Sequence, residues 1–411
     1  MRILLLSQNY PPEASSAAQK VSEMAEFLAQ NGHIVTIVTA FPNYPSGVVF
    51  EGYRRTWRTE ERIGTTKLVR SWLHVTKERH RFVPRLLSYV TFAATALVNS
   101  LGLGRQDVIY VYAPPTFLVP TAQVLAKILR AALVVDVHDL WPDAPIHLGY
   151  VKHPLAVAAA RGFERWTYAA PDKLLFYSET HRQKVIAKGA PAGKTAIVPL
   201  WIDTQKFHPL TGDAPAALRA AHGLTGHFVV TYTGNLGIPQ GLDVLLQAAD
   251  LLTQRGDTRV KFALVGGGAQ RDQLVALAEK LKLTNVVFVP PQPVTAMNVW
   301  MAASDLLMLH LDAAPFREGT VPGKLFFYMA SGRAVLAAAL GETEVLVRAH
   351  DCGVPIAPRD PVAMADAIAV LAADPERSAR LGRNGRAAAE AHFDRAKVLQ
   401  LMERELVSAA K

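Results

Sequence analysis

The segment APFREGTVPGKLFFYMASGRAVL, residues 314–336, places a glutamate, two glycines, a proline and a lysine directly ahead of an apolar run. A bound phosphate needs backbone N–H groups at a helix N-terminus, a close backbone approach and a fixed cation. Gly323 and Lys324, before a helix that we expect to begin near Leu325, supply all three. Glu318 could accept hydrogen bonds from hydroxyls of a sugar attached to that phosphate. The alternative interpretation is an ordinary turn with a solvated lysine and a surface acid.

Two further glycine-rich turns follow expected strands. YTGNLGIPQGL, residues 232–242, puts Gly234, Gly237 and Gly241 where backbone amides can face an anion. LVGGGAQRDQL, residues 264–274, contains a glycine triplet that is a weak signal by itself. Three such turns in one parallel-sheet domain favour a ligand that contains a diphosphate.

The motif HDLWPD follows a different expected strand. His138 and Asp139 come at its carboxyl end, where open sheets place ligands. His138 could hydrogen-bond a sugar or share a proton, and Asp139 could orient an acceptor hydroxyl. The alternative is a structural loop in which His138 bonds a backbone carbonyl and Trp141 fills the core.

The elements that must position these residues follow one strand–helix–strand pattern twice. We expect helices over 17–30, 242–253 and 273–281 and near Trp300. The expected strands are 2–7, 33–40, 108–113, 132–138, 173–179, 227–237, 261–268, 286–290, 305–311 and 334–339. This alternation predicts an α/β protein with parallel sheets in two doubly wound, Rossmann-like domains.

The two domains are predicted as 1–205 on the acceptor side and 206–389 on the donor side, with a linker at about 200–222. A final helix at about 390–411 could close the second domain or pack back on the first. Domains of this kind usually bind a ligand in the cleft between the carboxyl ends of their sheets.

Composition bounds the class of protein. A chain of 411 residues exceeds one ordinary core, and Cys352, its single cysteine, excludes an intramolecular disulfide. The apolar run in MRILLLSQNY is too short for a signal peptide, so we expect a cytoplasmic protein.

A cationic, aromatic interval contributes much of the net charge of +9. Its basic residues are Arg54, Arg55, Arg58, Arg62, Lys67, Arg70, Lys77, Arg79, Arg81 and Arg85, against Glu60, Glu61 and Glu78. Such a surface could attract anionic lipid or nucleic acid, although no nucleic-acid module accompanies it. The next segment, 86–104, has about the length of a membrane span but carries polar residues, which favours a core helix over peripheral membrane contact.

Taken together, these motifs resemble the family 4 retaining glycosyltransferases of the GT-B fold. The narrower resemblance is to the bacterial branch that builds O-antigen and capsular sugars and includes fucosamine transferases. The likeness covers nearly the whole chain, and its carriers are the segments 8–47, 134–150, 232–242, 264–274 and 321–336.

The resemblance implies a hexosyltransferase with a nucleotide-sugar donor, expected to be UDP-linked, and no cofactor or metal. It implies an acceptor that is undecaprenyl-diphosphate-linked or another saccharide, peripheral contact with an anionic membrane at the inner face of the plasma membrane, and no nucleic-acid partner. N-acetylfucosamine or a related amino sugar is the candidate group. The implied catalytic residues are His138, Asp139 and Glu318; the donor-binding residues are Gly234, Asn235, Gly237, Gln240, Gly266, Gly267, Pro291, Arg317, Gly323 and Lys324; the acceptor-side residues are Glu13, Ser15 and Ser16.

The chain departs from the wider family at several of these positions. Asn235 and Gln240 stand where the family has an arginine and a lysine, so diphosphate neutralisation would depend on Lys324. Gly323 stands where the branch commonly has serine.

A second glutamate of the family, which accepts hydrogen bonds from ribose, is matched by Phe327, or by Phe326 on a strict count. A phenylalanine cannot accept them, so ribose recognition would be weaker or would come from backbone or from Glu342 or Glu344. The resemblance separately implies that backbone near 289–292 contacts the base.

Breaking a sugar–diphosphate bond develops negative charge on the leaving oxygens, which Lys324 could stabilise. The sequence has no Asp-x-Asp triplet for a diphosphate-bound metal. Two other functions stay open: a nucleotide-sugar epimerase of the same fold, which would turn over without acceptor, and a non-catalytic protein that binds nucleotide sugars.

Overall fold

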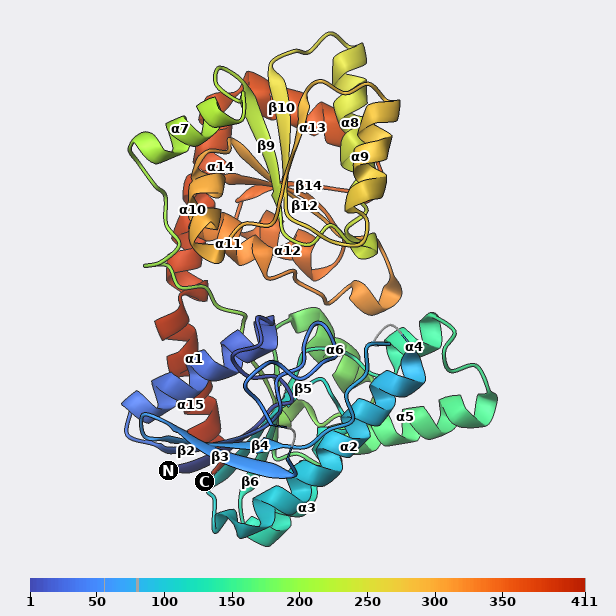
Figure 1. Cartoon of the computed structure of the whole chain (residues 1–411), viewed down its shortest axis with the longest axis vertical. Coiled ribbons are helices and arrows are strands. Elements are labelled where there is room, and N and C mark those ends of the chain that lie inside the picture. The colour runs from blue at the N-terminus through green and yellow to red at the C-terminus, as the bar shows by residue number, and fades with distance from the viewer. Residues whose placement is uncertain (55, 79–80, 411) are drawn as a thin grey trace. The chain divides into compact units, whose positions relative to one another are not determined.

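The computed structural model describes residues 1–54, 56–78 and 81–410 and divides the chain into two compact units (Figure 1). The N-terminal unit comprises Met1–Pro199 with Leu399–Lys411, and the C-terminal unit comprises Leu200–Val398. The first division falls slightly before the expected boundary at 205, and the chain rejoins the first unit at Leu399 rather than near 390. Arg55 and Arg79 of the basic interval lie outside the described residues.

Over the described residues, the N-terminal unit has an eight-stranded sheet in the order β3-β4-β2-β1-β5-β6-β7-β8. Its strands are β1(Arg2–Leu6), β2(Ile34–Ala40), β3(Arg58–Ile63), β4(Thr66–Ser71), β5(Val108–Ala113), β6(Ala132–Val137), β7(Lys173–Phe176) and β8(Thr195–Ile197). Every neighbouring pair is parallel except β3 with β4. β5 is buried along its whole length, as expected for a central strand covered on both faces.

Helices cover this sheet, and polar side chains define where several of them begin. The Ser15 side chain accepts from the Ala18 N–H and the Ser178 side chain from the His181 N–H, so each caps a helix N-terminus. The helices are α1(Ser16–Gln30), α2(Phe82–Ser100), α3(Leu118–Leu129), α4(Asp143–His147), α5(Pro154–Ala169), α6(Glu179–Ala187) and α15(Arg395–Ala409). Glu403 of α15 bonds the side chains of Asn31 and His33, so the end of the last helix packs on the N-terminal unit.

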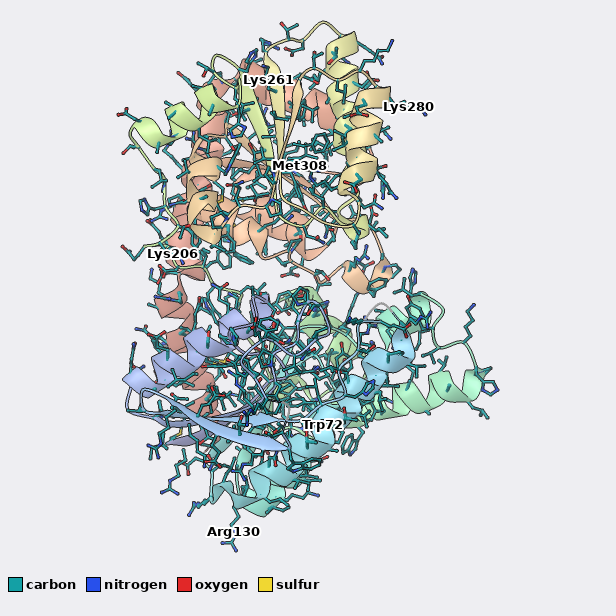
Figure 2. All side chains as sticks on the ribbon, in the orientation of Figure 1. Trp72, Arg130, Lys206, Lys261, Lys280 and Met308 are labelled. Atoms are coloured by element: carbon teal, nitrogen blue, oxygen red, sulfur yellow. The ribbon has the colours of Figure 1, made fainter. Side chains whose placement is uncertain are left out.

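In the described part of the C-terminal unit, a six-stranded, wholly parallel sheet has the order β11-β10-β9-β12-β13-β14. The strands are β9(Phe228–Thr233), β10(Val260–Val265), β11(Val286–Val289), β12(Leu306–His310), β13(Ala334–Ala338) and β14(Gly353–Ile356). The helices are α7(Asp213–Ala221), α8(Asp243–Gln254), α9(Arg271–Lys280), α10(Val294–Ala302), α11(Lys324–Ala330), α12(Glu342–Ala349), α13(Pro361–Ala373) and α14(Pro375–Ala388). Met308 lies inside this sheet, whereas the side chain of Lys280 points outward (Figure 2). The prediction of two Rossmann-like α/β units is confirmed.

The segment 200–222, predicted as an irregular linker, contains helix α7. Arg219 of α7 donates to the Ala303 carbonyl at 2.7 Å, and the ring of His222 lies 4.9 Å from that of Trp300. This short helix lacks a run of large apolar residues at helical spacing that would predict it, and no residue of α7 is fully buried.

The basic interval does not form one open cationic face. Its middle part folds as the antiparallel pair β3 and β4 at the sheet edge. Arg70 is buried and donates to Glu61 at 2.9 Å, while Arg58 and Lys67 both pair with Glu60. The two glutamates therefore neutralise half of the positive charge in this pair of strands.

Candidate functional site

One glycine turn follows β9 and another follows β10, and the two turns are in close contact. The Gly234 N–H donates to the Val265 carbonyl at 2.9 Å, and the Gly266 N–H donates to the Val289 carbonyl at 3.0 Å. A Cβ on Gly266 would lie 1.8 Å from the Gly234 oxygen, which no side chain can accommodate. Gly266 is therefore required by close backbone approach as well as by its φ of +154°.

We expect Gly266→Ala to lower the free energy of unfolding by about 3 kcal/mol, since backbone must move to admit the methyl group. Chemical denaturation of the whole chain measures this. Gly256→Ala is the matched control, because Gly256 also has positive φ but open space around its Cβ position. That control should cost only about 1 kcal/mol, and equal losses would contradict the steric argument.

Three predicted donor-binding residues come together at these turns. A Cβ on Gly267 would lie 2.8 Å from the Pro291 ring, and one on Gly268 would lie 2.6 Å from the Asn235 side-chain oxygen. The Leu236 N–H donates to the Gly267 carbonyl at 2.8 Å. The turn that follows β10 thus contacts both the segment after β11 and the turn that follows β9.

The two residues that replace the family's cations flank Gly237. A Cβ there would lie 2.6 Å from Asn235 Nδ2 and 2.7 Å from Gln240 Oε1. Gln240 Oε1 is buried and, among the described residues, has no hydrogen-bond partner. A buried acceptor left unsatisfied is costly, so this oxygen is available to a donor group of a ligand.

Lys324 is the first residue of α11, and its ammonium lies 3.7 Å from the centre of the Tyr232 ring. It also lies 3.3 Å from the Cβ position of Gly234, directly over the first glycine turn. Burial lowers the pKa of Lys324 to about 7. No carboxylate among the residues that the structure describes forms an ion pair with this ammonium, so the turn faces a cation without a counter-ion.

Gly323, the residue before α11, is exposed and has helical φ and ψ. A Cβ at this position would meet nothing within 4 Å. The space above the helix start is therefore open, so a serine would also fit without strain, and the close approach of a phosphate to Gly323 stays a prediction.

Glu318 and Arg317 line a cavity of about 210 Å³ beyond the ends of β12 and β13. The Glu318 carbonyl accepts from the Glu342 N–H at 2.7 Å, which fixes the backbone of this wall. Asp312 also lines the cavity, and its N–H donates to the Pro239 carbonyl at 3.0 Å. The glycine turn after β9 is thereby joined to the cavity that contains Glu318.

Neither phenylalanine that replaces the family's second glutamate lines this cavity. Phe327 packs edge-on against Phe207 at 4.7 Å, and Phe326 is buried edge-on against Phe393 at 4.9 Å. Both rings anchor α11, and with it Lys324.

Sequence reasoning missed an ionic network next to the turn. Arg359 binds both carboxylate oxygens of Asp312, at 2.6 and 2.7 Å, and both of Asp243, at 2.8 Å. The backbone N–H of Arg359 donates to His310 at 3.1 Å, and a Cβ on Gly241 would contact His310 and Asp312. These residues belong to no local motif and meet only because β9, β12 and the segment after β14 end at one edge of the sheet.

In the N-terminal unit, His138 is held by a carboxylate rather than by the backbone carbonyl of the structural alternative. His138 Nε2 lies 2.9 Å from Asp136 Oδ2, and the Tyr110 hydroxyl donates to the same oxygen at 2.5 Å. The imidazole is stacked between the rings of Tyr112, at 4.2 Å, and Tyr177, at 5.3 Å. Because an ionised carboxylate only accepts, Nε2 carries the hydrogen and the Nδ1 of a neutral His138 is left as an acceptor.

The chain that follows His138 is held in place by packing and by charge. Trp141 lies edge-on to Phe117 at 5.1 Å but is only half-buried, so it does not fill the core as the structural alternative predicted. Protein packed around the Asp139 carboxyl displaces water and raises its pKa, although one side of the residue is open to solvent. The ion pairs of the next helix are Asp143 with Arg161 and Lys188, and Glu164 with the same two cations.

The acceptor-side candidates lie after β1. Glu13 is buried, so a surface role is excluded; its Oε1 accepts from the N–H groups of Asn43 and Tyr44 at 2.7 and 2.8 Å. Ser15 uses its hydroxyl to cap α1, and Ser16 is exposed in the first turn of that helix. Glu13 and Ser15 therefore organise the loop that leads into α1, whose first residue, Ser16, is exposed.

Two family models match the chain. Residues 16–201 match the glycosyl transferase 4-like domain, and residues 227–374 match glycosyl transferases group 1. The colanic acid biosynthesis glycosyl transferase WcaI of Escherichia coli is 30% identical over 84% of this chain and 85% of its own length. A D-inositol 3-phosphate glycosyltransferase of Nocardia farcinica is 31% identical over 64% of this chain and 55% of its own length.

Among solved structures, HepE of Anabaena in complex with UDP-glucose superposes with a TM-score of 0.72 at 18% identity, over 99% of this chain and 100% of HepE. The lipopolysaccharide biosynthesis glycosyltransferase WaaG gives 0.68 at 16% identity, over 97% of this chain and 99% of WaaG. These two likenesses concern the fold. With the family models and the relationship to WcaI, they establish that the chain belongs to family 4 of the glycosyltransferases and has the GT-B fold.

Proposed function

We propose that this glycosyltransferase moves a hexose, with N-acetylfucosamine or a related amino sugar as the candidate, from a UDP-sugar to a lipid-linked or other saccharide acceptor. The observation that carries the proposal is the buried Lys324 ammonium, which faces a glycine turn without a counter-ion. The UDP-glucose bound by HepE and the colanic acid role in the name of WcaI support a UDP donor and surface polysaccharide synthesis. The reaction would take place in the cytoplasm at the inner membrane face.

In the proposed reaction, the bond between the anomeric carbon and the diphosphate oxygen breaks and the leaving diphosphate gains negative charge. Lys324 and the amides of the Gly234 turn stabilise that charge electrostatically. Glu318 binds donor-sugar hydroxyls, and the reaction needs no resident metal. The acceptor hydroxyl attacks from the face that the diphosphate leaves and gives its proton to the departing phosphate oxygen, so the configuration is retained without a protein nucleophile. His138 and Asp139 are the candidates for sugar and acceptor contact.

The test is calorimetric titration with UDP, GDP and ADP, followed by turnover of UDP-sugars with and without lipid-linked acceptors. Selective UDP binding with acceptor-dependent sugar transfer supports the proposal. Conversion of the UDP-sugar in the absence of acceptor would instead identify an epimerase, and binding without any turnover would identify a non-catalytic protein. Product anomeric configuration, read by NMR, tests retention.

The affinity for UDP should fall as pH rises from about 7 to 9, where the terminal phosphate is already ionised. Burial has lowered the pKa of Lys324 to about 7 in the free protein. A bound diphosphate favours the ammonium and raises that pKa, so binding takes up a proton between the two values. Titrations in buffers of different ionisation enthalpy measure the uptake, and a pH-independent affinity would contradict it.

A further inference from the structure

Helix α2 exposes apolar side chains, whereas an ordinary surface helix exposes polar ones. All exposed residues of α2 are apolar, and they recur every three or four positions, which places them along one side of the helix. The α2 stripe consists of these residues and the next exposed apolar residue: Val83, Leu87, Val90, Ala94, Val98 and Leu101. Its five large side chains are between 45% and 70% exposed. A continuous exposed apolar surface of this kind marks an interaction site.

The opposite side of α2 places Phe92 in the hydrophobic core and also carries polar side chains that bond to the interior of the N-terminal unit. Thr95 donates to the Trp72 carbonyl at 2.5 Å, and Asn99 donates to the Ser71 hydroxyl at 2.9 Å. Thr91 accepts from the His74 N–H at 2.9 Å. Rotating the helix to bury the stripe would break all three bonds, so the fold itself holds the apolar side outward.

By length and composition, Phe82–Leu103 is also the one stretch of the described residues that could cross a membrane. Over 18 of its residues the mean hydropathy is 1.5, and 39% of these residues are buried. The inward hydrogen bonds of α2 argue for a helix that lies on a surface. Neighbouring α3 is tied to α2 by the Thr121 hydroxyl, which donates to the Ala93 carbonyl at 2.9 Å. Val124 and Ile128 of α3 are exposed as well.

The charge around these two helices is mainly positive, although Arg81 pairs with Glu78 just before α2. From residue 81 to residue 130 the charged side chains are Arg81, Arg85, Arg105, Lys127, Arg130 and a single acid, Asp107. That acid is engaged, since it accepts from the Arg2 N–H at 2.7 Å. Arg130, at the end of α3, points away from the unit (Figure 2). Cations beside an apolar helix face complement an anionic lipid surface.

We propose that the α2 stripe is a membrane-docking surface, with α2 lying in the plane of an anionic bilayer and its flanking arginines and lysine on the headgroups. This places the apolar part of the membrane contact on the helix that follows the basic interval, whose last arginines, Arg81 and Arg85, lie at the start of that helix. The inference rests on the proposed function in one respect: a lipid-linked acceptor lies in the membrane, so the enzyme must dock there to reach it.

The experiment is co-sedimentation of the full chain with vesicles of phosphatidylcholine alone or mixed with phosphatidylglycerol. The test variant is Leu87→Glu with Val90→Glu, both on the stripe. The matched control is Val362→Glu with Val370→Glu, since these valines of α13 are each 50% exposed on a helix of the C-terminal unit. UDP titration of each protein reports whether the donor side is intact.

Wild type and control should sediment with the anionic vesicles, and the stripe variant should partition about tenfold less. Wild type that stays in solution at low salt, or a stripe variant that binds like wild type, would overturn the proposal. If wild type is a dimer that does not bind vesicles and the stripe variant is a monomer, a second copy of the chain would be identified as the occupant. Vesicle binding with no UDP binding by any protein would overturn the donor assignment and leave the docking surface standing.

Discussion

Lys324→Met should weaken UDP binding by about 100-fold, the effect of losing a charged hydrogen bond to a phosphate in a partly dry site. Methionine keeps most of the side-chain volume over the Tyr232 ring but removes the ammonium. Calorimetry measures the affinity. The same variant should lose the pH dependence of binding, because the group that titrates at about 7 is gone.

The fold of this variant should be at least as stable as wild type, since desolvation of an ammonium without a counter-ion disfavours the folded state. The matched control is Lys280→Met, because Lys280 is exposed at the end of α9 and points away from the unit (Figure 2). Retention of wild-type affinity by Lys324→Met would remove the central support for the donor site. Equal losses in both variants would show an effect of net charge alone.

His138→Ala should slow sugar transfer by about 100- to 1,000-fold while leaving UDP affinity within about twofold of wild type. His138 belongs to the N-terminal unit, whereas every candidate for diphosphate contact belongs to the C-terminal unit. The rate is measured as UDP release at saturating donor. His153→Ala serves as the control, since His153 is an exposed residue just before α5.

Asp136 acts through His138 as a positioning residue, so Asp136→Asn should change the pH profile of transfer as well as its rate. An amide can present either a donor or an acceptor to Nε2 and therefore no longer selects one tautomer of His138. Unchanged rate and pH profile in Asp136→Asn would mean that the Asp136–His138 bond is structural. Thermal unfolding of both variants separates this outcome from misfolding.

Much of the fold can be predicted because its signals are local. The strands β1, β5, β9 and β12 are near-continuous apolar runs, and such runs indicate parallel strands covered on both faces. The edge pair β3 and β4 escaped prediction because its sequences, RTEERI and TKLVRS, are rich in charged residues, which are equally typical of a solvated surface. Helix α7 escaped because it has no buried stripe.

The site divides in the same way. Gly234, Gly266 and Lys324 stand in short motifs whose backbone geometry is set by neighbours in sequence, and the structure brings them together as expected from a shared sheet edge. Arg359 carries no such signal, because its partners Asp312 and Asp243 lie far away along the chain.

By itself, the sequence determined the class of fold, most of the parallel strands, and the glycine turns, since hydrophobic period and φ preference act over a few residues. Only the tertiary structure decided which charges are neutralised and which face of each helix is covered. In the folded chain, Thr95 and Asn99 of α2 face the interior and Arg70 of the basic interval pairs with Glu61. Among the described residues, Lys324 has no counter-ion. Burial and pairing depend on groups that are far apart along the chain. They determine how strongly an ionisable group is desolvated and therefore how far its pKa is shifted.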